Sequence, residues 1–148
     1  IGDAAFGLKH LGHPLQQRLD YPTPRCELGV MLKDLASSMI DVSDALAQDL
    51  GHILNASGVG AKINLNQLPI QSALRQLSDN EQWKYALAGG DDYELCFTIS
   101  PQNYEKLSGQ QLNVPLTIIG EITQQTDLLF EYEGEIHPLL VHGYQHFA

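Results

Sequence analysis

The sequence predicts an α+β fold, a layered domain in which long helices pack on a mixed sheet of four to six strands. Two observations lead to this prediction. Segments with helical periodicity interleave with short alternating segments along the chain, and its last third is rich in strand-like segments. The 148 residues contain no internal repeat or low-complexity segment, so we expect one domain spanning 1–148.

Several segments have helical character. Over 26–35, apolar residues recur at the spacing of one helix face. A helix over 43–55 would bury a stripe of Leu and Ile and turn Asp49 and His52 outward, with Gly58 as a left-handed cap. Shorter helices are expected over 71–77, 80–87 and 101–107, and Asp3 is placed to cap another near the start of the chain.

Strands are expected over 37–42, 61–65, 93–99 and 115–122, followed by a hairpin of 128–132 and 136–140. The hairpin would turn at Glu133 and Gly134. The chain begins without a methionine, at what reads as the end of a strand, so we expect it to be a fragment cut at a domain boundary.

Composition narrows the class of function. The net charge of −10 argues against a nucleic-acid or anionic membrane surface, because both need clustered Lys and Arg. No apolar run is long enough for a membrane span, and no signal peptide opens the chain, so we expect a cytoplasmic protein. Cys26 and Cys96, far apart in sequence, are expected to be reduced and mostly buried thiols.

The first acidic stretch is DVSD at 41–44, where an apolar strand passes into a helix. Ser43 is placed to be the helix N-cap, and Asp44 in the first turn suits the helix dipole, so the stretch could serve stability alone. Alternatively, Asp41 and Asp44 flank a turn and could share a Mg²⁺ ion, which prefers oxygen ligands. The Ser43 hydroxyl and nearby backbone N–H groups could then contact a phosphate.

The second acidic stretch is GGDDYE at 89–94. Asp91, Asp92 and Glu94 repel one another unless a positive group lies among them, and the two glycines allow close backbone approach to a ligand. The alternative is a glycine helix stop followed by a solvated acidic turn. We expect the two stretches to meet at one edge of a single sheet and to help bind phosphate and Mg²⁺.

The other polar signals are weaker. His142 and His146, four residues apart, could bind a metal only on a helix, and an exposed tail explains them better. Arg25 follows two prolines and could face an anion, although an ion pair with a local acid is the simpler interpretation.

Taken together, these motifs resemble the thiamine-monophosphate kinase family, and its C-terminal domain in particular. The resemblance runs from GDAAFGL at 2–8 and PTPR at 22–25 through MIDVSDAL at 39–46 and DLGHIL at 49–54. It continues through AGGDDYEL at 88–95 to GYQHF at 143–147. Each motif is modest, and their order and spacing make the resemblance specific.

The resemblance implies the C-terminal domain type of the aminoimidazole-ribonucleotide synthetase superfamily, which also includes selenophosphate synthetase. It implies a homodimeric protein whose N-terminal nucleotide- and metal-binding domain is absent from this chain. Such a protein would use ATP and Mg²⁺ to phosphorylate thiamine monophosphate, giving thiamine diphosphate, and this chain alone would be inactive.

On this chain the resemblance makes Asp41 and Asp44 ligands of Mg²⁺ and Ser43 a contact to ATP. It makes Asp91 and Tyr144 contacts to thiamine monophosphate, and it assigns no residue as catalytic. The sequence departs from the family pattern at three positions, where Ala45 replaces a usual Gly, Asp91 a common Glu and Gln145 a common Asp. Because Asp is one methylene shorter than Glu, the reach of Asp91 to the substrate is altered.

Two alternatives stay open at this point. The chain could be the C-terminal half of another ATP-dependent synthetase of the same superfamily, acting on a different phosphorylated substrate. It could also be a non-catalytic binding module whose acidic turns are degenerate.

Overall fold

A computed structural model describes residues 1–138 of the chain. Its elements follow one another in the order α1 (Asp3–Lys9), α2 (Gln16–Asp20), α3 (Cys26–Leu32), β1 (Ala36–Val42), α4 (Leu46–Ser57), β2 (Gly60–Asn64), the 3₁₀ turns η1 (Leu65–Gln67) and η2 (Leu74–Gln76), α5 (Asp79–Ala88), β3 (Glu94–Ile99), α6 (Pro101–Ser108), β4 (Gly120–Thr123), β5 (Leu128–Tyr132) and β6 (Glu135–Ile136).

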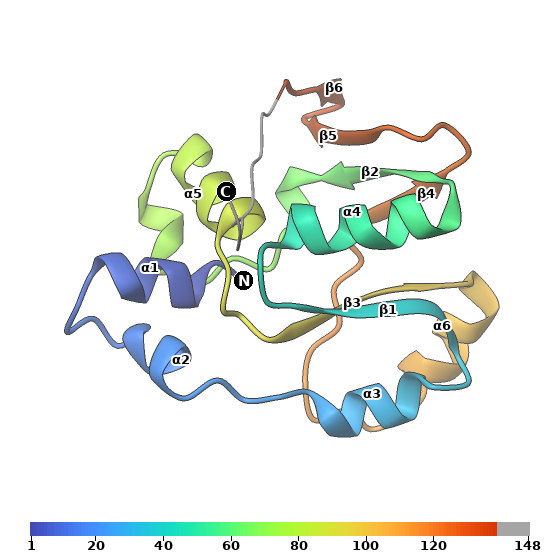
Figure 1. The fold of residues 1–148 in the computed structure, drawn as a ribbon, viewed down its shortest axis with the longest axis horizontal. Coiled ribbons are helices and arrows are strands. Elements are labelled where there is room, and N and C mark those ends of the chain that lie inside the picture. Colours follow the sequence, from blue (N-terminus) through green and yellow to red (C-terminus); the bar gives the residue numbers. More distant parts are fainter. Residues whose placement is uncertain (139–148) are drawn as a thin grey trace.

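The strands form two separate sheets (Figure 1). The larger has the order β4-β2-β5-β6, with β2 and β5 parallel and the two outer strands antiparallel to their neighbours. This is a mixed four-stranded sheet, and it confirms the predicted α+β class. β1 and β3 form an antiparallel ribbon of their own. The expectation that the strands join one mixed sheet is therefore wrong. The two acidic stretches still lie at one end of a single sheet, which is this two-stranded ribbon.

The helices and the two sheets stack in layers because their apolar faces pack against one another. In Figure 1, α4 lies between the four-stranded sheet and the ribbon, and α3 and α6 lie on the other side of the ribbon. The predicted stripe of α4 is buried in the larger core, with Leu46, Leu50 and Leu54 each 4% exposed. A smaller core forms around Leu28, Leu32 and Leu107 of α3 and α6. The ribbon is thus packed on both faces, which holds its end in place.

Three segments are shorter or less regular than the sequence predicts: 26–35, 115–122 and 71–77. The helix expected over 26–35 ends at Leu32 and continues as a tight turn, in which the N–H of Leu35 donates to the carbonyl of Leu32 at 3.0 Å. The strand expected over 115–122 is reduced to β4, because Val114 and Leu116 pack on the smaller core instead of joining the sheet. The segment 71–77 forms only the turn η2, and the part of the predicted hairpin beyond 138 lies outside the described residues.

Helix ends follow the local sequence in most places. Gly58 ends α4 in the left-handed region at φ 63°, as predicted. The Ser100 side chain accepts a hydrogen bond from the N–H of Asn103, which confirms the helix start before Pro101. Asp3 does not cap α1; it is the first residue of the helix, and Gly2 at φ 79° precedes it.

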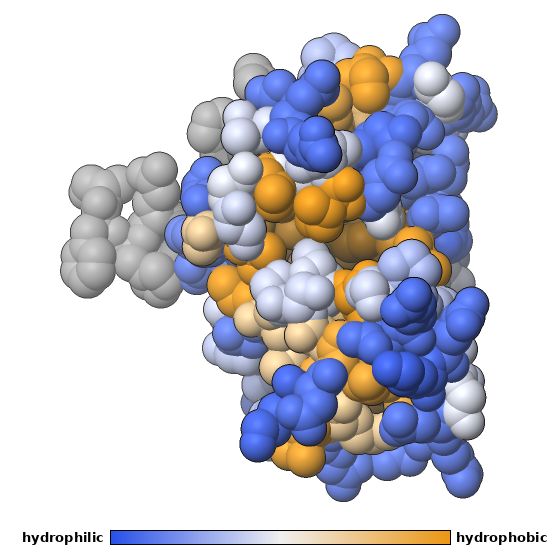
Figure 2. Space-filling model, turned by 90° about the vertical axis from the view of Figure 1, so that its right-hand side faces the viewer, coloured by the Kyte–Doolittle hydropathy of each residue, from blue (hydrophilic) through white to orange (hydrophobic). Residues whose placement is uncertain are grey.

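One face of the molecule is mostly hydrophilic, with apolar side chains gathered between the hydrophilic ones. Seen from the end of the molecule that lies at the right of Figure 1, apolar side chains gather in a hollow near the middle of the face, with hydrophilic side chains around it (Figure 2). None of the helices within residues 1–138 combines the length and apolar character needed to cross a membrane.

The two thiols have different environments. Both cysteines are free; Cys96 on β3 is buried in the larger core, but Cys26 at the start of α3 is exposed, so the expectation of two mostly buried thiols is wrong for Cys26. Burial raises the pKa of the Cys96 thiol to about 11, and the charge of Asp49 adds to the shift.

We expect iodoacetamide at neutral pH to modify Cys26 in the folded chain and to leave Cys96 unmodified, because only an accessible thiolate reacts. Mass spectrometry should find one added group on the native protein and two after unfolding in denaturant. Equal labelling rates of both thiols in the native protein would contradict this burial.

Candidate functional site

The two acidic stretches meet where β1 ends and β3 begins. Val42 and Glu94 form the last pair of the ribbon. Beyond this pair, the N–H of Tyr93 donates to the carbonyl of Val42 at 2.8 Å, and the N–H of Asp91 donates to the carbonyl of Ser43 at 2.8 Å. The backbone ladder therefore extends past the strand ends. The predicted meeting of the two stretches is confirmed, at the end of a two-stranded ribbon.

The second stretch approaches the first so closely that a side chain is excluded at one position. A Cβ added to Gly90 would lie 2.7 Å from the carbonyl oxygen of Ser43 and 2.8 Å from that of Asp44. Asp91 and Tyr93 then adopt left-handed backbone conformations, with φ of 66° and 51°. For residues other than Gly this conformation costs about 1–2 kcal/mol each, and such outliers cluster at functional sites.

A single buried carboxylate organises the turn between β1 and α4. Asp49 Oδ2 accepts hydrogen bonds from the backbone N–H groups of Ser43, Asp44 and Ala45, at 3.1, 3.2 and 3.1 Å. Asp49 is 3% exposed. Its prediction as an outward-facing residue is therefore wrong, because its side chain folds back over the turn to pair three N–H groups that would otherwise be unsatisfied.

Two further expectations about this turn change with it. Ser43 is not the N-cap of α4; Ala45 takes that position in an extended conformation, at φ 177°, and the helix begins at Leu46. Asp44 accordingly precedes the helix, and its Oδ2 accepts a hydrogen bond from the Gln48 side chain at 3.1 Å. The N–H groups of this turn donate to Asp49, so a phosphate contact at the turn would depend on the Ser43 hydroxyl.

The two carboxylates expected to bind Mg²⁺, Asp41 and Asp44, lie at this junction together with Asp91, the expected substrate contact. Asp41 on β1 and Asp91 are exposed, and Asp44 is half-buried. All three can offer only oxygen ligands, which suit a hard cation such as Mg²⁺. Within residues 1–138 no group of three or more His, Cys, Asp or Glu side chains is arranged to hold a metal ion. The junction could therefore supply only part of a coordination shell.

Asp92 has a structural role that the sequence did not reveal. It is 1% exposed, and its carboxylate accepts hydrogen bonds from the N–H groups of Gly2 at 2.6 Å and Ala4 at 3.4 Å. Burial raises the pKa of Asp92, and this outweighs the opposing effect of the two N–H groups. The second stretch is therefore not a solvated acidic turn: Asp91 and Tyr93 point outward while Asp92 anchors the loop to the start of α1.

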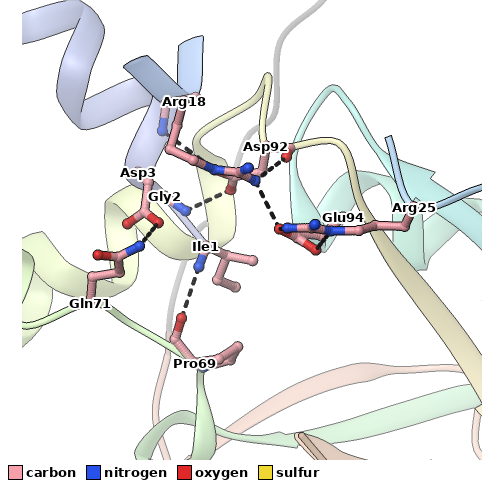
Figure 3. A network of polar contacts seen from close by, with 10 residues as sticks. Ile1, Gly2, Asp3, Arg18, Arg25, Pro69, Gln71, Asp92 and Glu94 are labelled. Atoms are coloured by element: carbon pink, nitrogen blue, oxygen red, sulfur yellow. Dashed lines mark hydrogen bonds and ion pairs between the residues drawn. The ribbon is translucent and has the colours of Figure 1, made fainter. Parts of the chain in front are cut away.

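Glu94 lies between two arginines (Figure 3). Arg25 donates from Nε and Nη2 to the two carboxylate oxygens at 2.8 and 2.6 Å, and Arg18 donates from Nη2 to Oε1 at 2.8 Å. Burial alone would raise the pKa of Glu94, but the hydrogen bonds and charge of Arg25, with the charge of Arg18, hold it below its ordinary value. The expectation that Arg25 forms an ion pair with an acid is confirmed, but its partner Glu94 lies 69 residues away in the sequence and is not a local acid. Tyr144, His142 and His146 lie outside the described residues.

We expect Asp49→Ala to lower the free energy of unfolding by about 2–4 kcal/mol, because it leaves three N–H groups of the turn without their acceptor. Urea denaturation of the two proteins measures this difference. The exposed Asp34 supplies a matched control, since Asp34→Ala removes a carboxylate at the surface and should change stability by less than about 0.5 kcal/mol. Equal effects of the two substitutions would show that the turn does not depend on Asp49.

Comparison with known proteins places this site in a family context. The family described as AIR synthase related protein, C-terminal domain, matches residues 12–132. The thiamine-monophosphate kinase of Escherichia coli (strain K12) is 43% identical, over 99% of this chain and 50% of the relative. That of Haemophilus influenzae is 44% identical, over 84% of this chain and 42% of the relative. The chain thus spans about half the length of the curated relatives it matches.

Solved structures agree with these matches. The thiamine-monophosphate kinase from Stenotrophomonas maltophilia K279a has a TM-score of 0.81 at 38% identity, covering 93% of this chain and 48% of that protein. AaThiL complexed with AMPPCP and TMP has a TM-score of 0.79 at 27% identity, covering 99% of this chain and 48% of that protein. Since the family match extends over most of the sequence, the chain belongs to the AIR synthase related proteins, as a C-terminal domain of that family.

Proposed function

We propose that this chain is the C-terminal part of a thiamine-monophosphate kinase, which transfers the γ-phosphate of ATP to thiamine monophosphate and gives thiamine diphosphate. The observation that carries the proposal is the junction at which 41–44 and 91–94 are held side by side by backbone hydrogen bonds. The kinase relatives, 43% identical over 99% of this chain, support it. A structural relative that holds AMPPCP, an analogue of ATP, together with TMP supports the two substrates.

We assign roles at the junction as follows. Asp41 and Asp44 would hold Mg²⁺, and Ser43 would contact ATP through its hydroxyl, because its N–H donates to Asp49. Asp91 would contact thiamine monophosphate from its exposed, left-handed position, and Tyr144 would contact it from the C-terminal tail. Mg²⁺ held by Asp41 and Asp44 would offset the negative charge of the phosphate groups.

The mechanism requires positioning and charge compensation from these side chains. The attacking oxygen belongs to the phosphate of thiamine monophosphate, which is already ionised at neutral pH, so no side chain of this chain needs to act as a base. The role of the junction is to hold the two phosphate groups in line against their mutual repulsion, since effective positioning lowers the barrier to transfer. The incomplete ligand set within residues 1–138 is consistent with the remaining ligands coming from another part of the protein.

The whole protein would include an N-terminal nucleotide- and metal-binding domain and would act as a cytoplasmic homodimer. The share of each relative that this chain leaves unmatched, about half, supports the additional domain. The net charge of −10 supports small-molecule substrates over nucleic acid or a membrane surface.

In the full-length protein, we expect Asp41→Asn to lower kcat/KM for phosphorylation of thiamine monophosphate by about 10²-fold or more, because one charged ligand oxygen at the phosphates is lost. A coupled assay of ADP release measures the rates. Asp34→Asn, which neutralises an exposed carboxylate without a predicted role, should keep the wild-type value. Asp41→Asn with unchanged activity would support the non-catalytic binding module instead.

A further inference from the structure

The loop that presents Asp91 is bent into an unfavourable shape and must be held there. Its residues alternate between exposed Asp91, buried Asp92 and exposed Tyr93. The two exposed residues have a positive φ, a backbone conformation that is unfavourable for residues other than Gly. One side of the loop is fixed by the backbone bonds to Val42 and Ser43. The other side is fixed by contacts to the first 25 residues of the chain.

Arg18 is the central contact on that second side. Its Nη2 donates both to the carbonyl of Asp92 at 3.0 Å and to Glu94 Oε1 at 2.8 Å, so it spans the loop and the start of β3 (Figure 3). Asp92 in turn holds the N–H groups of Gly2 and Ala4. The contacts therefore join α1, α2 and β3 around the loop.

Glu94 determines where Arg18 lies. Its carboxylate accepts from Arg25 through two parallel hydrogen bonds at 2.8 and 2.6 Å, a geometry that fixes orientation as well as distance. The side chains of Arg18, Arg25 and Glu94 are 22%, 19% and 31% exposed, so solvent reaches them only partly. Glu94 thus holds two cations, one of which supports the Asp92 carbonyl.

We propose that Glu94, with Arg18 and Arg25, is the positioning group for the acceptor side of the site. The inference rests on the proposed kinase function and adds to it the residues that set the place of Asp91. Glu94 is not among the residues proposed to contact a substrate, and its carboxylate is paired with Arg18 and Arg25. It acts through Arg18 on the backbone of Asp92, the residue next to Asp91. The nucleotide side is organised separately by Asp49, through the turn that contains Ser43 and Asp44.

This separation gives a kinetic signature that general destabilisation would not produce. In the full-length protein, Glu94→Gln should raise KM for thiamine monophosphate about tenfold while KM for ATP stays within about twofold of wild type. Arg25→Lys keeps the positive charge but loses the paired hydrogen bonds, and it should raise the same KM about threefold. If Glu94→Gln does not fold, Arg25→Lys provides the test.

Glu121→Gln is the matched control, because it removes another carboxylate from an ion pair, with Lys62 at 3.1 Å on the four-stranded sheet. It should leave both KM values unchanged. Suppose that the wild type is active and that Glu94→Gln and Arg25→Lys leave KM for thiamine monophosphate unchanged, or raise both KM values equally. This result would overturn the present inference but not the proposed function. A wild-type protein that transfers no phosphate to thiamine monophosphate would overturn the proposed function, and this inference with it.

Discussion

Two backbone hydrogen bonds beyond the last pair of the β1–β3 ribbon determine the geometry of the site. They join Tyr93 to Val42 and Asp91 to Ser43, each at 2.8 Å. They form only because Gly90 leaves room for the Ser43 and Asp44 carbonyls, and because two residues of the loop accept left-handed conformations. Close-packed side chains on both faces of the ribbon fix the position of its end. The fold thereby keeps these two backbone hydrogen bonds in register.

The parts of this arrangement that depend on local periodicity could be predicted from the sequence. The buried stripe of α4, the cap at Gly58 and the ladder-forming alternation of β3 all depend on neighbours within a few residues. The proximity of the two acidic stretches also could be predicted, because each follows or precedes a strand. The separation into two sheets could not, since it depends on α4 fitting between the ribbon and the other strands.

The missed features have tertiary causes. Asp49 occupies a position on α4 that periodicity assigns to solvent, and only the folded turn places three N–H groups around its carboxylate. Asp92 reads as one of three exposed acids until the start of α1 is brought against it. Arg18 gave no signal at all, because its partners are more than seventy residues away in the chain. In each case a buried or half-buried polar group has partners that sequence spacing does not encode.

The continuous ladder also constrains how molecules reach the site. A loop that is hydrogen-bonded to its neighbouring strand on one side and clamped by arginine on the other cannot swing open as a separate flap. The loop that presents Asp91 is therefore held from both sides. A ligand arriving at this junction would therefore meet a preformed wall that keeps its shape, so little of the binding free energy would be spent on ordering the loop.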